Sequence, residues 1–145
     1  MTSYPRVGDC RSIALPYHDD SGGSLTVLER ATEIPFDVRR AYLITEVPSG
    51  ATRGSRAKVR ASELFVCASG AVTVRVEDEH STRSVPLSAR SGALLVPPML
   101  WVELRSFVPG TVIVVFTNAD ERDPDREHLR DHRAWLAARR VARVA

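Results

Sequence analysis

The chain has 145 residues, of which 43% are hydrophobic and 26% are charged, which is the balance of an ordinary globular domain. Its formal net charge of +2 is too small to indicate a nucleic-acid partner, and no apolar run approaches the roughly 20 residues of a membrane span. We therefore expect no nucleic acid and no membrane among its partners. Two cysteines, Cys10 and Cys67, do not make a disulfide framework, and no signal sequence precedes the first strand, so we expect a cytoplasmic protein.

The first half of the chain predicts an arm followed by short strands. Residues 1–10 lack periodicity and are expected to form an N-terminal arm. Residues 11–17 are a candidate edge strand, and residues 18–23 are rich in turn-forming residues. Runs of β-branched and apolar residues, bounded by Gly, Pro, Ser or Asp, predict further strands at 24–29, 39–47, 63–67, 71–77, 84–87, 93–96, 100–107 and 111–117.

Eight or nine strands at about ten-residue spacing are typical of an antiparallel sandwich or barrel of the jelly-roll type. After residue 117 the composition changes, and residues 126–145, rich in Ala, Leu and Arg, predict a helix. Leu129, Trp135 and Leu136 give this helix a narrow apolar stripe, enough to pack on the outside of the barrel. The prediction is a single domain, residues 1–145, with its barrel at 11–117 and a C-terminal helix at 126–145.

The stretch from Arg53 to Gly70 has the residue pattern, here called the frame, of an active-site strand pair in a small barrel. Alternate residues of a strand point to the same side, so Arg56 and Lys58 are expected to share one face and one cavity. Glu63 follows five residues later, at the start of the next predicted strand. In cupin barrels this frame usually carries a pair of histidines, and here it carries two long cations.

Several short motifs resemble those of the nucleotide-sugar 3,4-ketoisomerases, the cupin enzymes that act on dTDP-4-keto-6-deoxyglucose. They extend from about residue 20 to residue 135 and comprise Asp20-Ser-Gly-Gly-Ser-Leu25, Ile34-Pro-Phe36 with Arg40-x-Tyr42, Arg53-Gly54, Glu63-Leu-Phe-Val-Cys67-x-x-Gly70, the segment from Gly92 to Trp101, and Asn118-Ala-Asp120. The resemblance implies an all-β fold, a cupin jelly-roll barrel with a C-terminal α-helix. It also implies a homodimer and a small-molecule substrate, a dTDP-linked keto-sugar, in carbohydrate or secondary-metabolite biosynthesis.

The departures from the family are concentrated in the site. The family has Arg-Gly-x-His-Ala-His where this chain has Arg53-Gly-Ser-Arg-Ala-Lys58, so Arg56 and Lys58 stand in place of the histidine pair. The family also has His after the tryptophan at position 101, where this chain has Val102. None of the four histidines falls on a predicted site strand, and only His18 is a candidate for the mouth of the barrel.

A 3,4-ketoisomerisation removes a proton next to a ketone and returns one to the neighbouring carbon through an enediol. It needs a base and a group that stabilises the enolate. Arg56 cannot be the base, because a guanidinium stays protonated in proteins, but it can stabilise an enolate, a carboxylate or a phosphate. The candidate proton carriers are Lys58, if it loses its charge in the barrel, Glu63 and Glu103.

By position in the family pattern, the candidate substrate-binding residues are Arg40, Tyr42, Arg53 and Trp101. No metal and no other cofactor is expected, because a cupin metal site takes two or three histidines and a carboxylate. A plainer interpretation is also open, in which Arg56 and Lys58 lie on a solvated strand face or form an ion-pair network with Glu63 and Glu103, and Trp101 belongs to the core.

Three functions fit the sequence. The first is a rewired isomerase or cyclase that uses Lys, Glu and Arg in place of the histidine pair. The second is a catalytically inactive protein that binds a nucleotide sugar or another anion. The third is a structural or interaction module whose barrel is filled by its own side chains.

Overall fold

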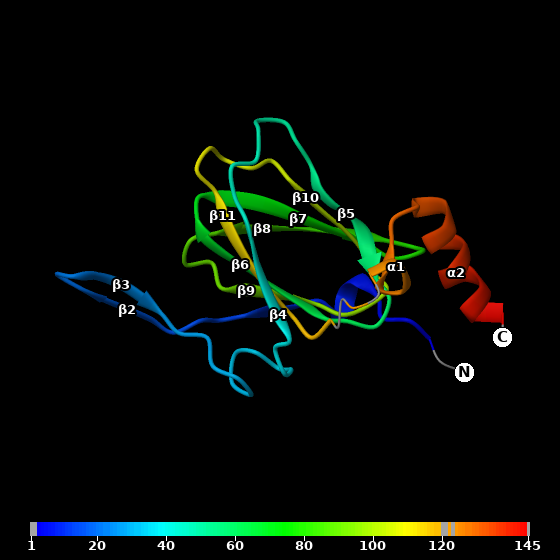
Figure 1. Cartoon of the computed structure of the whole chain (residues 1–145), viewed down its shortest axis with the longest axis horizontal. Helices are drawn as coiled ribbons and strands as arrows, with labels where there is room; N and C mark the ends of the chain where they lie inside the picture. Colours follow the sequence, from blue (N-terminus) through cyan, green and yellow to red (C-terminus); the bar gives the residue numbers. More distant parts are fainter. Residues whose placement is uncertain (1–2, 120–121, 123, 145) are drawn as a thin grey trace.

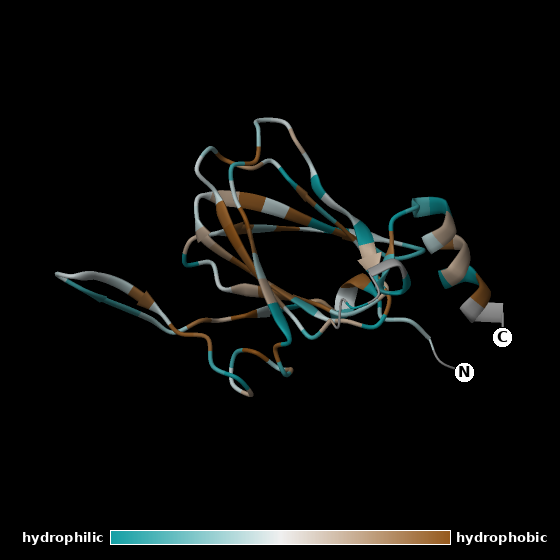
Figure 2. Cartoon of the chain, viewed as in Figure 1, coloured by the Kyte–Doolittle hydropathy of each residue, from teal (hydrophilic) through white to brown (hydrophobic). Residues whose placement is uncertain are grey.

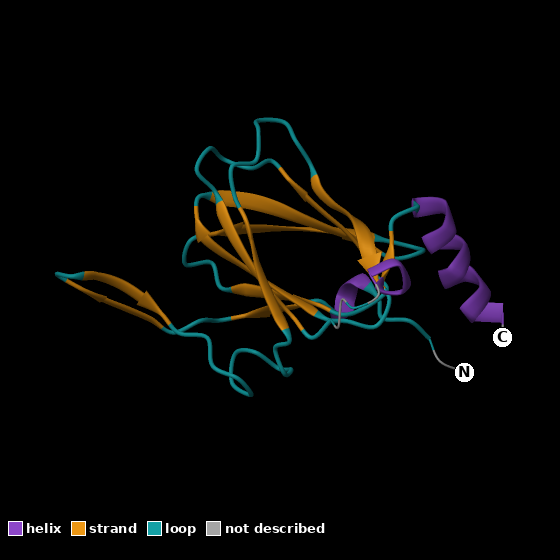
Figure 3. Ribbon diagram, viewed as in Figure 1, coloured by secondary structure: helices purple, strands orange, loops and turns teal. Residues whose placement is uncertain are grey.

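The computed structural model describes residues 3–119, 122 and 124–144, and its main body consists of two five-stranded antiparallel sheets that face each other (Figures 1 and 3). The first sheet has the order β1 (Arg11–Ile13), β9 (Ala93–Val96), β6 (Glu63–Ser69), β11 (Val112–Thr117) and β4 (Arg40–Ile44). The second has the order β12 (His128–Leu129), β5 (Arg53–Lys58), β10 (Trp101–Arg105), β7 (Ala71–Glu77) and β8 (Thr82–Ser88). This is the cupin-like jelly roll that the sequence predicts.

The core lies between the two sheets because each strand turns its apolar positions inward. Along β7, Val72, Val74 and Val76 are buried and the residues between them are partly exposed, and Figure 2 shows the same alternation in hydropathy. The facing strands contribute further buried side chains, among them Phe65 and Ile113. The strand predicted at residues 71–77 is therefore present, with one face turned to the core.

The C-terminal segment is not the continuous helix that the sequence predicts. A one-turn helix, α1 (Pro124–Glu127), is followed by the short strand β12 and then by α2 (His132–Val144). The segment is not helical here because β5 has a free edge with which it can pair. The Glu127 side chain accepts hydrogen bonds from the backbone N–H groups of Arg60 and Ala61. The backbone carbonyl of Glu127 accepts one from the N–H of Val59. Long-range backbone bonding thus overrides the local helical composition. Residue 145 of the predicted helix lies outside the described residues.

α2 packs on the outer face of the second sheet, as its apolar stripe predicts (Figure 1). Trp135 is fully buried there, and its indole N–H donates to the carbonyl of Met99. None of the helices in the described ranges is long and apolar enough to cross a membrane.

The N-terminal region differs from the prediction, since the strand predicted at 11–17 extends only over Arg11–Ile13. Residues 18–23 belong to a hairpin of β2 (Tyr17–Asp20) and β3 (Gly23–Thr26), which projects away from the barrel (Figure 1). Pro16 separates this hairpin from β1, because proline has no N–H to continue a ladder. Before β1, the described part of the predicted arm contains a short 3₁₀ helix, η1 (Val7–Asp9).

Gly70→Ala is expected to lower the free energy of unfolding by about 2–4 kcal/mol. Gly70 turns β6 into β7 at a φ of +78°, and a Cβ atom there would lie 2.3 Å from Oγ1 and 2.7 Å from Cα of Thr111. Gly110→Ala is the matched control, since Gly110 has a φ of +82° and open space around it, and it should lose only about 1–2 kcal/mol. Urea denaturation followed by circular dichroism measures both, and equal losses would contradict the clash.

Candidate functional site

Three of the predicted site residues point into the barrel from three different strands. Tyr42 of β4 lies opposite Val115, Arg56 of β5 lies opposite Val102, and Glu63 of β6 lies opposite Val96. All three valines belong to the core between the sheets. Directly opposed residues of an antiparallel pair share a face, so the three polar side chains share the interior with the core.

These three side chains form a hydrogen-bonded chain. The Tyr42 hydroxyl donates to Oε2 of Glu63 over 2.6 Å, and Nη2 of Arg56 donates to the Tyr42 oxygen over 3.2 Å. Glu63 is only 4% exposed, so its carboxylate depends on such donors in place of water. The barrel interior therefore holds a cation and a carboxylate with a phenol between them.

A cavity of about 70 Å³ opens beside this chain. Its lining comes from β4, β5, β6 and β10 and consists of Tyr42, Leu43, Ile44, Arg53, Gly54, Arg56, Glu63, Phe65, Val102 and Leu104. In the part of the chain that the structure describes, Nε of Arg56 is buried and has no hydrogen-bond partner. An unsatisfied buried donor costs about 1–3 kcal/mol or more, and an anionic ligand oxygen in the cavity would satisfy it.

Lys58 lies two residues beyond Arg56 on β5 and contacts a histidine that the sequence analysis missed. His128 of β12 is opposite Lys58 in the ladder, and its Nε2 lies 2.7 Å from Nζ of Lys58. Both side chains are buried, with 3% of Lys58 and 9% of His128 exposed. No local pattern could reveal this pair, because the two residues are 70 positions apart and meet only where β12 adds to the edge of β5. The other candidate, His18, lies exposed on the projecting hairpin.

Glu103 and Trp101 lie on the other face of the second sheet. Trp101 is opposite Glu77 and Glu103 is opposite Arg75, both on the side of β7 that faces away from the core. The Trp101 indole packs against Trp135 beneath α2 and donates to Oε1 of Glu103 over 3.2 Å. The structure therefore separates these two residues from the interior chain, because residues 101 and 103 alternate with the inward-facing Val102.

Glu103 also pairs with Arg105 on the same outer face. This is the charge pairing that the plainer interpretation of the sequence describes. That interpretation fits Trp101 and Glu103, whereas Arg56, Lys58 and Glu63 lie in the interior and not on a solvated strand face.

Two exposed arginines lie around the cavity. Arg53 lines it directly, and Arg40 lies on the same side of β4 as Tyr42, with its guanidinium carbon 5.9 Å from the centre of the Tyr42 ring. With Arg56 they place three guanidinium groups on or near the opening between β4 and β5. Guanidinium groups suit phosphate oxygens, because they can donate two parallel hydrogen bonds.

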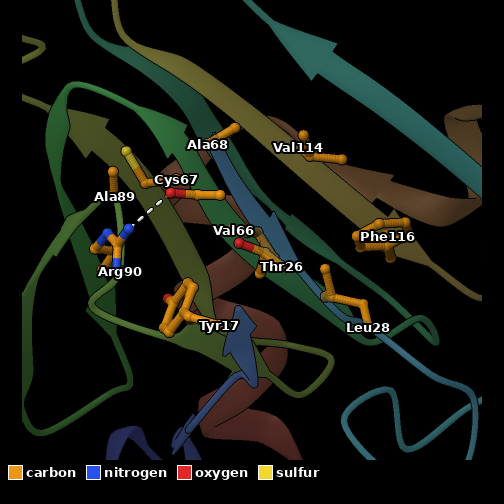
Figure 4. A pocket seen from close by; sticks show the side chains of 11 residues that line it. Tyr17, Thr26, Leu28, Val66, Cys67, Ala68, Ala89, Arg90, Val114 and Phe116 are labelled. Atoms are coloured by element: carbon orange, nitrogen blue, oxygen red, sulfur yellow. Dashed lines mark hydrogen bonds between the residues drawn. The ribbon is translucent and has the colours of Figure 1, made fainter. Parts of the chain in front are cut away.

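A larger groove of about 320 Å³ lies on the outer face of the first sheet, next to the hairpin (Figure 4). Figure 4 shows mainly apolar side chains around it, with Tyr17 and Arg90 on one side. Arg90 is bound to the hairpin, where its guanidinium donates to Asp19 and to Ser24. The hydrogen bond from Arg90, followed by one from the Ser24 side chain, lowers the pKa of Asp19 to about 2.

The groove also offers a thiol, from Cys67, but burial raises the pKa of that group above its ordinary value. The hydroxyl of Tyr17 accepts a hydrogen bond from the backbone N–H of Gly92. The groove thus lacks the combination of carboxylate, phenol and cation found inside the barrel. We therefore place the candidate site in the interior.

Across the described ranges 3–119, 122 and 124–144, no three His, Cys, Asp or Glu side chains gather in a way that could hold a metal ion.

Comparison with known proteins identifies the family of the chain. A family model described as FdtA, WxcM-like, C-terminal matches residues 8–140. The sequence is 30% identical over 111 residues to the TDP-4-oxo-6-deoxy-alpha-D-glucose-3,4-oxoisomerase of Aneurinibacillus thermoaerophilus, which covers 75% of this chain and 80% of the relative. The chain belongs to the FdtA family.

Solved structures agree with this assignment. QdtA, a sugar 3,4-ketoisomerase of Thermoanaerobacterium thermosaccharolyticum solved in complex with TDP, matches with a TM-score of 0.87 at 25% identity, over 94% of this chain and 98% of that one. A 3,4-ketoisomerase of Helicobacter canadensis matches with a TM-score of 0.85 at 24% identity, over 91% and 98% of the two chains. The resemblance of this chain to the sugar 3,4-ketoisomerases, which its motifs predicted, is confirmed.

Proposed function

We propose that this chain is a nucleotide-sugar isomerase that moves a carbonyl group between neighbouring carbons of a TDP-linked keto sugar. Arg56 would stabilise the enolate oxygen, Tyr42 and Glu63 would position the hydroxyl groups of the sugar, and Lys58 would supply the base. The reaction would need no metal. The protein would act in the cytoplasm, in sugar or secondary-metabolite biosynthesis.

The unpaired Nε of Arg56 carries this proposal. A buried guanidinium donor that borders a cavity is suited to an oxygen that becomes negative during the reaction, and it needs no reorganisation when that charge develops. The negative charge of an enolate oxygen is of this kind. Tyr42 and Glu63 lie next to Arg56, and their hydrogen-bonding groups match the hydroxyl groups of a sugar.

The nucleotide part of the proposal rests on the relatives and on the rim of the cavity. One relative is named for action on a TDP-linked oxo-deoxyglucose, and a solved neighbour was crystallised with TDP. Arg40 and Arg53 provide exposed guanidinium groups beside the opening, where a diphosphate would lie.

Incubation with TDP-4-keto-6-deoxyglucose in D₂O tests the proposal. Proton NMR should show loss of the C3 proton signal and growth of the 3-keto isomer, and TDP should raise the melting temperature of the protein. TDP-glucose, which has no ketone, is the control and should exchange no carbon-bound proton. If the keto sugar shows no exchange above the rate without protein and TDP leaves the melting temperature unchanged, the proposal is wrong.

The size of the cavity favours a second candidate. Pockets that enclose small ligands usually measure about 300–1,000 Å³, and the interior cavity measures about 70 Å³. A chain whose barrel is filled by Arg56, Tyr42 and Glu63 could bind the nucleotide at the rim without turning over the sugar. A rise in melting temperature with TDP and no exchange in D₂O would support this inactive binding protein.

The homodimer expected from the family also remains a proposal. It is supported by the outer face of the first sheet, where Leu43 is 66% exposed and lies beside Val114 and Phe116, themselves only partly buried. Leu25 of the projecting hairpin is similarly exposed.

A further inference from the structure

The Tyr42 hydroxyl lies between a buried carboxylate and a guanidinium, and all three groups line the interior cavity. Its bond to Oε2 of Glu63 measures 2.6 Å, which is the length of a hydrogen bond from a hydroxyl group to an ionised carboxylate. The carboxylate can therefore accept the phenol proton along this bond. Nη2 of Arg56 lies 3.2 Å from the phenol oxygen, where it stabilises the negative charge that this oxygen gains as its proton moves.

The strand arrangement explains why these three groups meet at one place. Tyr42 of β4 lies opposite Val115 of β11, and Glu63 is the first residue of β6, the strand on the other side of β11. These two side chains thus come from one sheet, and Arg56 reaches them from β5 of the facing sheet. The chain of hydrogen bonds therefore crosses the barrel interior beside the cavity that a ligand can enter.

Position 56 carries an arginine where the family pattern has a histidine, and the two side chains differ in proton transfer. An imidazole can accept and donate a proton near neutral pH, whereas a guanidinium keeps its protons. The group bonded to Arg56 is a phenol, which can accept one proton and donate another at the same oxygen atom. Tyr42 and Glu63 thus supply, one side chain away, the proton exchange that Arg56 lacks.

A 3,4-ketoisomerisation moves two protons, and only one of them is bound to carbon. The first passes from C3 to C4. The second passes from the hydroxyl group at C3 to the oxygen at C4, because the product has its ketone at C3 and its alcohol at C4. The two oxygens are on neighbouring carbons, so a single group in contact with both can carry this second proton.

We propose that Tyr42 is a catalytic residue that carries the hydroxyl proton between the two sugar oxygens, with Glu63 as its temporary acceptor. We call these two residues the Tyr42–Glu63 relay. The inference rests on the proposed function and deepens it, because it gives a chemical role to side chains that otherwise only position the sugar. It concerns the second proton alone and does not depend on which group takes the proton from C3.

The step balances without any co-reactant. After the C3 proton has been removed, the intermediate has a C3–C4 double bond, a negative O4 beside Arg56 and a hydroxyl group at O3. When C4 takes a proton, the electrons of the double bond form the C4–H bond, and an electron pair of O3 forms the carbonyl at C3. The released O3 proton passes to the Tyr42 oxygen while Tyr42 passes its own proton to Glu63. Glu63 then returns a proton through Tyr42 to O4, and both side chains regain their starting forms.

Two rates measured in D₂O separate the two protons. Exchange of the C3 proton of TDP-4-keto-6-deoxyglucose requires only its removal, whereas formation of the 3-keto isomer also requires the hydroxyl proton to move. Tyr42→Phe should keep the exchange rate within about threefold of the wild-type rate and lower the rate of isomer formation about 100- to 10,000-fold. Proton NMR follows both rates in one sample.

Glu63→Gln is a second variant, which tests the inference if Tyr42→Phe does not fold. The amide keeps an oxygen that accepts the bond from Tyr42, but it cannot take up the proton. This variant should therefore lose isomer formation and keep most of the exchange. Tyr4→Phe is the matched control: Tyr4 packs with Trp135 on the outer face of the second sheet, and its variant should keep both rates within about twofold.

The results distinguish a failure of the relay from a failure of the proposed function. If the wild-type protein forms no 3-keto isomer, the proposed function fails and the relay fails with it. If the wild-type protein forms the isomer and the variants keep its ratio of isomer formation to exchange, the function stands and the relay is wrong.

Discussion

Arg56→Met is expected to lower turnover of the TDP-linked keto sugar about 100- to 1,000-fold, the usual effect of removing one donor to a developing oxyanion. Arg56 would interact with the sugar oxygen most strongly when that oxygen becomes an enolate, so the loss should appear in kcat and leave KM nearly unchanged. The protein should remain folded, because the buried Nε that is removed has no partner among the described residues, and loss of the bond from Nη2 leaves the Tyr42 hydroxyl bonded to Glu63. Steady-state kinetics with NMR detection of the 3-keto product measures the effect.

Arg11→Met is the matched control for this prediction. Arg11 is an exposed arginine on β1, at the far edge of the first sheet from β4, and its replacement should leave kcat and KM within about twofold of the wild-type values. A normal kcat for Arg56→Met would remove the guanidinium from the mechanism. A raised KM with normal kcat would show that Arg56 binds the substrate and the transition state equally well.

Arg139→Met is expected to lower the free energy of unfolding by about 3–5 kcal/mol, because it leaves a buried carboxylate without its cation. Arg139 is 1% exposed and joins three segments that are far apart in the sequence. Its Nε donates to Glu79 over 2.5 Å, its Nη1 to the carbonyl of Met99 over 2.8 Å, and its Nη2 to the carbonyl of Pro5 over 2.7 Å. Loss of this side chain should therefore weaken the docking of both α2 and the N-terminal segment.

Urea denaturation monitored by tryptophan fluorescence measures this loss, since Trp135 lies in the same interface. Arg140→Met is the control: it removes an exposed arginine from the next position of α2 and should change the free energy of unfolding by less than about 0.5 kcal/mol. Equal effects of the two substitutions would show that the buried ion pair of Arg139 adds nothing to the free energy of unfolding.

The pattern of the sequence was sufficient to predict the barrel. Period-two alternation indicates which face of a strand is buried, and in β7 the buried face is that of Val72, Val74 and Val76. The same rule placed Arg56 and Lys58 on one interior face, where a family comparison expects the site. Each of these predictions depends only on neighbouring residues, whose side-chain directions are set by the local geometry of the strand.

Period-two alternation could also have indicated that Glu103, unlike Glu63, faces away from the barrel interior, since Glu103 is next to the inward-facing Val102. The family pattern grouped them because both are near motif positions in the sequence. The pairing of β10 with β7 places Glu103 on the outer face of the second sheet, because Glu103 lies opposite the outward-facing Arg75.

By itself, then, the sequence determined the strands of the two sheets other than β12, the jelly roll and the interior cations at positions 56 and 58. Only the tertiary structure decided that His128 meets Lys58, because that contact depends on backbone hydrogen bonds between two segments 70 residues apart. Composition favoured a helix that includes residue 128. The segment is a strand instead, because it supplies hydrogen-bond partners to the N–H and C=O groups at the edge of β5. The Lys58–His128 contact therefore involves a part of the chain that no local pattern marks.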